Sequence, residues 1–303
     1  MVDITHKSNT LRSATAQAIV KVSKQATIDA IKNDKVPKGN VFAMSKAAGL
    51  LGVKKTADLL PDCHPMPIEF TGIEYEIQDL NITISLTVKT IYKTGVEVEA
   101  MHGASIVALN MYDMLKPIDK GIEISTIKLV EKTGGKSSYK TPSTTNIMAG
   151  VIVCSDRVSK GEAEDRSGKL IKERFREYDI PTEIAVIPDE IDQIQEQVKK
   201  MAEQCNFIVL TGGTGLGPRD VTPEALEPLL DKRIDGVEEK IRRYGQDRMP
   251  YAMLSRSVVG TMGNCLIMAL PGSSKGVKES LDAVLPHIFH IFSILKGEGH
   301  NNG

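Results

Sequence analysis

A glycine-rich stretch in the second half of the sequence, TGGTGLGPRD at residues 211–220, has the residue types of an anion-binding loop. It follows the apolar run NFIVL (206–210) and precedes VTPEALEPLL, which begins like a helix. Closely spaced glycines let backbone N–H groups converge, and a helix N-terminus adds partial positive charge. The stretch has no Walker A lysine, and a dinucleotide fingerprint counted from Gly213 would need glycine at Pro218. We therefore predict a phosphate-binding loop that follows neither common signature.

Acidic residues accompany this loop and others that leave the carboxyl ends of expected strands. The loops are SDRVSKGEAEDRSG (155–168), IPDE (187–190), TGGTGLGPRD and PGSS (271–274), and their carboxylates are Asp156, Asp165, Asp189 and Asp220. Carboxylates beside a bound anion are typical of a bridging Mg²⁺, because bare like charges would repel the ligand. Ordinary helix capping explains any one of these loops alone. Four of them on one sheet edge favour a site for a phosphate ligand and magnesium.

Charged residues also occur at suggestive spacings in the first half. Asp113 and Lys116 in YDMLKP are i, i+3 on one helix face, although a plain surface ion pair has the same spacing. Glu97 and Glu99 begin a helix, where the helix dipole alone favours acids. His64 lies in the proline-bounded LLPDCHPMP, where a structural histidine is as good an explanation as a functional one.

Two other signatures in the first half fail. KTGGKSS (132–138) ends like a Walker A loop, but residue 130 is valine where that signature needs its first glycine. Cys63 and His64 are neighbours, yet no further ligands stand at zinc spacing. We therefore predict no P-loop and no tightly bound metal in this half.

The elements that position the second-half loops alternate between strand and helix. Thr222 and Pro223 would open the helix after the glycine-rich loop, as its cap and first residue. The expected strands are 149–155, 182–187, 206–210 and 264–270, and the other helices lie near 169–178, 191–204 and 275–295. This alternation predicts an α/β domain with a doubly wound, mostly parallel sheet that binds ligands at the carboxyl ends of its strands.

The elements of the first half follow no regular alternation. Ser23 and Asn40 would cap its first two helices. The expected strands are 14–22, 73–77, 82–88 and 122–130, and the expected helices are 24–32, 41–52 and 99–115. Strands that adjoin in sequence and an irregular order predict an α+β domain with an antiparallel sheet.

A stretch rich in Gly, Ser, Thr and Pro, GGKSSYKTPSTTN at 134–146, separates the two patterns. A chain of 303 residues is long enough to bury two cores. We predict one domain over residues 1–140, a linker over 141–147 and a second domain over 148–303.

The composition excludes several classes of protein. A net charge of −1, 4% aromatic residues and no tryptophan give no basis for nucleic-acid binding. Four cysteines without a C-x-x-C pair indicate free thiols in a reducing compartment. The N-terminal MVDITHKSNT has no apolar signal core, and no apolar run is long enough to cross a bilayer. We expect a cytoplasmic protein with neither nucleic-acid nor membrane partners.

The second-half motifs SDR-S-G---D-SG, IPDE, TGGTG--PRDVTPEAL and LPG resemble the molybdopterin-binding family, and within it the molybdopterin adenylyltransferases, over roughly residues 148–296. The resemblance implies transfer of AMP from Mg-ATP to the terminal phosphate of molybdopterin. It makes Asp189 and Asp220 catalytic residues that position magnesium and the ATP phosphates. It also implies contacts to the pterin phosphate or nucleotide from Gly212, Gly213 and Thr214, and contacts to the pterin from Ser155, Asp156 and Ser273.

The first-half motifs MVD, HP, KTGVE-EA, YDM-K and K-GGKS resemble the cyclic pyranopterin monophosphate synthase family over roughly residues 1–140. The resemblance implies rearrangement of a cyclised, GTP-derived triphosphate with release of pyrophosphate. Asp113 and Lys116 would be its central acid/base and charge-stabilising pair. The further substrate contacts that it implies are Arg12, Lys38, Cys63, His64, Val98, Glu99 and Lys132.

Together the two resemblances imply a bifunctional enzyme of molybdenum cofactor synthesis that acts on the GTP-derived triphosphate and on molybdopterin with Mg-ATP. Synthase relatives form hexamers with active sites between subunits and adenylyltransferase relatives form trimers, so we expect a homo-oligomer, trimer or hexamer. Other cofactor-synthesis proteins must insert sulfur between the two steps. Two alternatives for the second half are a non-catalytic module that binds and delivers molybdopterin, and a generic nucleotide-dependent phosphotransferase.

Overall fold

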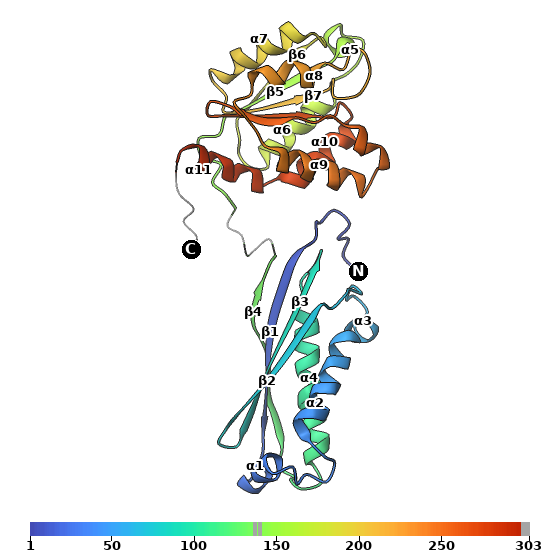
Figure 1. Cartoon of the computed structure of the whole chain (residues 1–303), viewed down its shortest axis with the longest axis vertical. Helices are drawn as coiled ribbons and strands as arrows, with labels where there is room; N and C mark the ends of the chain where they lie inside the picture. The colour runs from blue at the N-terminus through green and yellow to red at the C-terminus, as the bar shows by residue number, and fades with distance from the viewer. Residues whose placement is uncertain (136–137, 139–140, 298–303) are drawn as a thin grey trace. The chain divides into compact units, whose positions relative to one another are not determined.

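The computed structural model describes residues 1–135, 138 and 141–297. The chain forms two compact units, Met1–Lys140 and Thr141–Gly303 (Figure 1). The first has an antiparallel sheet with helices and the second a mostly parallel sheet with helices, so both predicted fold classes are confirmed. Within the described ranges, no helix has the length and apolar character that a membrane span requires.

The first unit is a four-stranded sheet in the order β2-β3-β1-β4, with every neighbouring pair antiparallel. Its strands are β1 Thr10–Lys21, β2 Phe70–Gln78, β3 Asn81–Tyr92 and β4 Glu123–Thr133. Its helices are α1 Gln25–Lys32, α2 Val41–Lys54, α3 Thr56–Leu59 and α4 Glu97–Leu115. Figure 1 shows α2 and α4 lying side by side along the sheet.

One face of this sheet forms the core of the first unit. Residues 14, 16, 18 and 20 of β1 are buried, and those between them are partly exposed, which is the alternation of a half-buried strand. The buried residues pack against α4. Gly103 permits the close approach, because a Cβ there would lie 2.4 Å from Val53 on α2 and 2.9 Å from Leu86 on β3. The core thus places α4, with Glu97 and Glu99 in its first turn as expected, against both α2 and the sheet.

One of the two predicted caps in the first unit is wrong. The hydroxyl of Ser23 donates to the buried Asp119, and α1 begins at Gln25 without a side-chain cap. A buried carboxylate needs hydrogen-bond donors more than an exposed helix end does, because the helix end can bind water. Asn40 does cap α2, with its Oδ1 accepting from Ala43 N at 2.8 Å.

The second unit is a six-stranded sheet in the order β6-β5-β7-β10-β9-β8. The first four of these are parallel, and β9 and β8 add an antiparallel edge. The strands are β5 Ala149–Cys154, β6 Thr182–Ile187, β7 Phe207–Thr211, β8 Lys232–Arg233, β9 Val259–Met262 and β10 Cys265–Leu270. The helices are α5 Asp156–Ser159, α6 Ser167–Arg176, α7 Ile191–Ala202, α8 Thr222–Leu226, α9 Asp235–Gln246, α10 Ser274–Val284 and α11 Ile291–Leu295. Short 3-10 helices lie at Glu227–Leu229, Pro250–Leu254 and His287–His290.

Helices cover both faces of this sheet, so β5 is buried along its whole length. Val151 and Val153 belong to a core with α6, α9 and α10, and Ile152 belongs to a second core with α7 and α8. In Figure 1, α7 lies on one side of the sheet and α6, α9 and α10 on the other.

Two expectations for the second unit are wrong. Thr222 does not cap α8; it is buried, and its Oγ1 donates to Gly212 O at 2.9 Å, which ties the start of α8 to the glycine-rich loop. The helix predicted over 275–295 is interrupted, since α10 ends at Val284 and α11 begins at Ile291. Pro286 has no N–H to donate and its ring clashes with the preceding turn of a helix.

Candidate functional sites

The loops of the second unit meet where its strand order reverses. The chain passes from β5 to β6 on one side and returns to β7 on the other side of β5. Open α/β sheets bind ligands at such a point, outside the carboxyl ends of the strands. The glycine-rich loop after β7 and the loop that begins at Ser155 after β5 both leave the sheet at this point.

Backbone N–H groups of the glycine-rich loop point to an anion site. Gly212 N donates to Leu270 O and Thr222 N donates to Gly213 O, which holds both ends of the loop. In the part of the chain that the structure describes, the four N–H groups from Gly213 to Leu216 donate to no protein acceptor. Gly212 and Gly213 have φ of 107° and 62°, values that favour glycine. Consecutive N–H groups without partners are typical of a bound anion.

Asp189 faces this loop with one oxygen unsatisfied. Its Oδ2 accepts from Asp156 N at 3.0 Å, whereas its Oδ1 is buried and has no hydrogen-bond partner among the described residues. A Cβ built on Gly213 would lie 3.2 Å from that Oδ1. Burial raises the pKa of the Asp189 carboxyl. A buried carboxylate oxygen without a partner is costly unless a ligand completes it.

Asp156 is in the opposite electrostatic situation. The Arg219 guanidinium donates to both of its carboxylate oxygens at 3.0 Å, and also lies 2.8 Å from Glu190. The hydrogen bonds from Arg219 lower the pKa of Asp156. Arg219 therefore links three of the four loops. Of the four loop carboxylates, Asp189 is the one that has a buried oxygen without a hydrogen-bond partner among the described residues.

Asp220 shapes its own loop. Its Oδ2 accepts from Gly217 N at 2.7 Å, and a Cβ on Gly215 or Gly217 would lie 2.7 or 2.8 Å from the same oxygen. The capping explanation for Asp220 is wrong, because Val221 occupies the cap position of α8 and no side chain caps that helix. Its magnesium role stays a prediction.

The described residues at this site offer a metal ion one buried carboxylate oxygen without a hydrogen-bond partner, that of Asp189. Within the described residues, no three His, Cys, Asp or Glu side chains are grouped so that they could hold a metal ion. Mg²⁺ needs only one or two carboxylates when substrate phosphates and water complete its shell. The unsatisfied oxygen of Asp189 meets that requirement.

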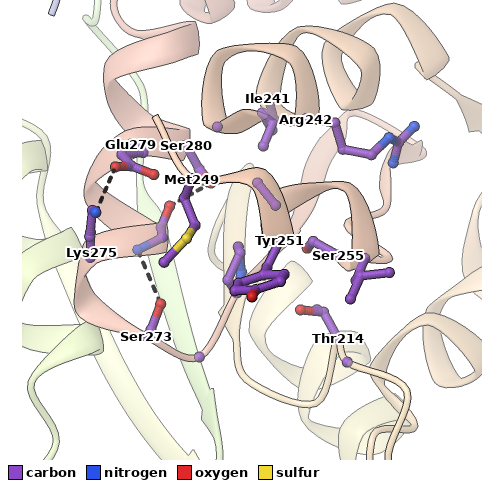
Figure 2. A pocket seen from close by; sticks show the side chains of 17 residues that line it. Thr214, Ile241, Arg242, Met249, Tyr251, Ser255, Ser273, Lys275, Glu279 and Ser280 are labelled. Atoms are coloured by element: carbon purple, nitrogen blue, oxygen red, sulfur yellow. Dashed lines mark hydrogen bonds and ion pairs between the residues drawn. The ribbon is translucent and has the colours of Figure 1, made fainter. Parts of the chain in front are cut away.

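Two cavities flank the turn at Gly272 and Ser273. The large cavity, of about 390 Å³, is walled by Tyr251 and its neighbours in the 3-10 helix Pro250–Leu254, by α9 and by α10 (Figure 2). The small cavity, of about 280 Å³, is bordered by Ser155 and Gly212. Ser273 borders both while its Oγ caps α10 by accepting from Gly276 N at 3.1 Å. Two adjoining cavities offer room for two ligands, and residues 250–254, which wall the large one, belong to none of the sequence motifs.

Three charged residues meet near the end of α4 in the first unit. Asp113 accepts from Lys116 at 2.7 Å and from Lys38 at 2.6 Å, and all three side chains are about half exposed. The hydrogen bonds from Lys116 and Lys38 lower the pKa of Asp113 to about 2, and Asp113 raises the pKa of Lys116. The predicted pair thus forms, and the fold adds Lys38 from the turn before α2.

Glu99, at the opposite end of α4, is the most deeply buried of the predicted contacts in the first unit. Its Oε1 accepts from Cys63 Sγ at 2.9 Å, and its buried Oε2 has no partner among the described residues. Burial raises the pKa of Cys63 to about 12, so its thiol keeps the proton that it donates. An unsatisfied buried oxygen here favours a ligand that donates a hydrogen bond.

The remaining predicted contacts lie at the same end as Glu99. Lys132 pairs with Glu97 at 2.9 Å, and Arg12 donates to Tyr92 O at 3.3 Å. His64 Nε2 donates to Val2 O at 2.8 Å, and Val98 is 45% exposed. Lys136 and Ser137 of the K-GGKS motif lie outside the described residues.

A single chain does not bring the cluster around Asp113 and the contacts around Glu99 together. A helix rises about 1.5 Å per residue, so Glu99 and Asp113 are roughly 21 Å apart along α4. That separation exceeds the reach of a side chain.

Comparisons with known proteins find relatives for each half and for the whole chain. Residues 1–135 match the MoaC family, and residues 150–290 match the probable molybdopterin binding domain. The molybdenum cofactor biosynthesis bifunctional protein of Chlorobaculum tepidum is 41% identical over 99% of this chain and 96% of its own. The protein of the same name from Synechococcus elongatus is 38% identical over 99% and 98%. The cyclic pyranopterin monophosphate synthase of Aquifex aeolicus is 44% identical over 46% of this chain and 54% of its own.

Proposed function

Because this chain belongs to the family of bifunctional molybdenum cofactor biosynthesis proteins, we propose a separate reaction for each of its two domains. The first domain converts the cyclised, GTP-derived triphosphate into cyclic pyranopterin monophosphate and releases pyrophosphate. The second domain transfers AMP from Mg-ATP to molybdopterin. The chain thereby acts early and late in the synthesis of one cofactor.

The reaction proposed for the second domain is supported by one observation: among the described residues, N–H groups without acceptors lie beside the Asp189 oxygen that has no hydrogen-bond partner. The N–H groups from Gly213 to Leu216 suit a phosphate, and Asp189 Oδ1 lies beside them. A bare carboxylate would repel that phosphate, so the combination fits a phosphate that arrives with Mg²⁺. Asp189 and Asp220 would hold the ion, which supplies charge neutralisation and Lewis acidity to the phosphates.

The residues of this chain would do the binding and orienting. The terminal phosphate of molybdopterin is the nucleophile, an oxygen of it forms the new bond to the α-phosphorus of ATP, and pyrophosphate leaves. Gly213 and Thr214 hold phosphate through their open N–H groups, whereas Gly212 N stays bonded to Leu270 O and Gly212 only shapes the loop. Ser155 and Ser273 contact the pterin from the borders of the small cavity. Asp156 contributes by accepting from Arg219, which ties the glycine-rich loop to the loop after β5. No lysine is required, because positioning and charge stabilisation carry this chemistry.

The test is to incubate the full chain with molybdopterin and Mg-ATP and to analyse the products. Adenylylated molybdopterin and pyrophosphate in equal amounts are expected. Molybdopterin binding without pyrophosphate release would establish the delivery module instead. ATP turnover that does not depend on molybdopterin would favour the generic phosphotransferase and contradict both pterin functions.

For the first domain, the cluster of Asp113, Lys116 and Lys38 supports the synthase reaction. Ammonium groups suit a triphosphate substrate and a pyrophosphate leaving group. Because its pKa is held at about 2, Asp113 stays ionised near neutral pH, and it raises the pKa of Lys116. Glu99, which accepts from Cys63, lies roughly 21 Å away along α4. We therefore propose that the substrate lies between subunits and contacts opposite ends of two copies of this domain.

A trimer or hexamer is the expected state in solution, since both domains then share a threefold axis in one closed assembly. Light scattering at micromolar concentration measures the mass directly. A monomeric or dimeric mass would contradict both the shared site and the threefold arrangement.

Replacing Asp220 with Asn is expected to lower AMP transfer by about a hundredfold, since one electrostatic contact in a site shielded from water contributes roughly 3 kcal/mol. Molybdopterin affinity should be retained or rise, because the Asn carbonyl can still accept from Gly217 N while the negative charge is gone. Asp220→Ala removes the hydrogen bond as well and should weaken molybdopterin binding too. Affinity is measured by titration and transfer by product analysis. An Asn variant with normal transfer would make Asp220 a structural residue of the loop.

A further inference from the structure

Arg256, which none of the sequence motifs includes, holds the glycine-rich loop at two places. It follows the 3-10 helix Pro250–Leu254. Its Nε donates to Gly215 O at 2.8 Å and its Nη2 to Asp220 O at 2.6 Å. Its backbone N donates to Thr214 O at 3.0 Å. One residue therefore binds three carbonyl groups of this loop.

These contacts set the direction of the N–H groups that the loop offers to a ligand. In a planar trans peptide, the C=O of one residue and the N–H of the next point in opposite directions. The carbonyls of Thr214 and Gly215 accept from Arg256, so the N–H groups of Gly215 and Leu216 point away from Arg256. Both belong to the set that donates to no acceptor in the described part of the chain.

The guanidinium itself is already engaged by the protein. Its third nitrogen, Nη1, forms an ion pair with Glu224 on α8, so each of the three nitrogens has a protein oxygen as partner. Glu224 also balances the positive charge. An arginine in this situation acts on an anion through the loop and not as its direct ligand.

We propose that Arg256 is a positioning residue in the second domain. It holds residues 214–220 in the conformation that binds phosphate. This inference rests on the function proposed above for that domain. Gly215 and Gly217 have wide backbone freedom, so without the guanidinium their peptides can rotate and must be ordered when the ligand binds. A lysine has a single ammonium group and does not reproduce the two hydrogen bonds that the guanidinium donates to Gly215 O and Asp220 O.

The variants Arg256→Lys and Arg256→Ala of the full chain test the proposal. Each lost hydrogen bond is expected to weaken binding of molybdopterin and ATP about fivefold to tenfold, so the Lys variant should lose roughly tenfold and the Ala variant roughly a hundredfold. Titration with each ligand measures the affinity, and pyrophosphate release measures the turnover. The matched control is Arg233→Lys, another arginine of this domain with carboxylate partners, which should change neither.

Two further readouts separate positioning from general damage. Methylguanidinium at millimolar concentration should restore affinity to Arg256→Ala and leave the wild type and Arg233→Lys unchanged. The thermal unfolding midpoint of Arg256→Lys should stay near that of the wild type. Normal affinity in Arg256→Lys, or a loss in Arg256→Ala that methylguanidinium does not reverse, would overturn the proposal.

The same experiment distinguishes a failure of the role proposed for Arg256 from a failure of the adenylylation on which that role rests. If the wild type binds molybdopterin or ATP but releases no pyrophosphate, the transfer function fails, while the affinities of the variants still decide the role of Arg256. If the wild type binds neither ligand, both the function and this inference are wrong.

Discussion

Replacing Asp113 with Asn, or Lys116 with Ala, is expected to lower pyrophosphate release from the GTP-derived triphosphate by about a hundredfold to a thousandfold, since each change removes a charge from the cluster. Asp113→Asn leaves Lys38 and Lys116 without the carboxylate that now orients both of them. Lys116→Ala removes one of the two ammonium groups that would meet the leaving pyrophosphate. The rate is followed by a coupled pyrophosphate assay on the full chain.

The fold should survive both changes, because ion pairs between half-exposed side chains contribute little to stability. The matched control is Asp58→Asn, which breaks another exposed i, i+3 pair of the same domain, Lys55–Asp58 at 2.8 Å. Asp58→Asn should keep full turnover, and all three variants should unfold near the wild-type temperature. Near-normal turnover in either Asp113→Asn or Lys116→Ala would remove that pair from the proposed site.

Asp189→Asn is expected to lower AMP transfer to molybdopterin by about a hundredfold to a thousandfold. Asparagine has nearly the shape of aspartate, and its side chain can still accept from Asp156 N, but it lacks the negative charge that Mg²⁺ requires. Molybdopterin affinity without magnesium should not fall, because the loop N–H groups are untouched. Product analysis with Mg-ATP and titration without metal measure the two effects separately.

Two controls sharpen this result. Asp192→Asn changes an exposed carboxylate in the first turn of α7 and should leave transfer normal. Treating the wild type with a chelator should reproduce the loss seen in Asp189→Asn, and magnesium should restore the wild type alone. Normal transfer by Asp189→Asn would show that its unsatisfied oxygen is not a magnesium ligand, and loss of molybdopterin affinity would assign Asp189 to the loop's structure.

The sequence by itself determined the two fold classes and most of the elements. Alternation of apolar residues in β1 and regular alternation of strand and helix after residue 149 reflect which side chains are buried, and burial follows from periodicity within one element. The i, i+3 pair of Asp113 and Lys116 and the cap that Asn40 gives to Ala43 were readable for the same reason, since in each the two partners are three residues apart. The glycine-rich loop was readable because its position between a strand and a helix is a local feature.

The tertiary structure alone decided which polar group pairs with which. Ser23 and Thr222 are good capping residues, yet distant groups, Asp119 and Gly212 O, take their hydroxyls. The unsatisfied oxygen of Asp189 and the hold of Arg256 on the loop depend on residues brought together from separate strands. Local spacing carries no information about such partners, because a hydrogen bond forms with whichever group the fold places within reach.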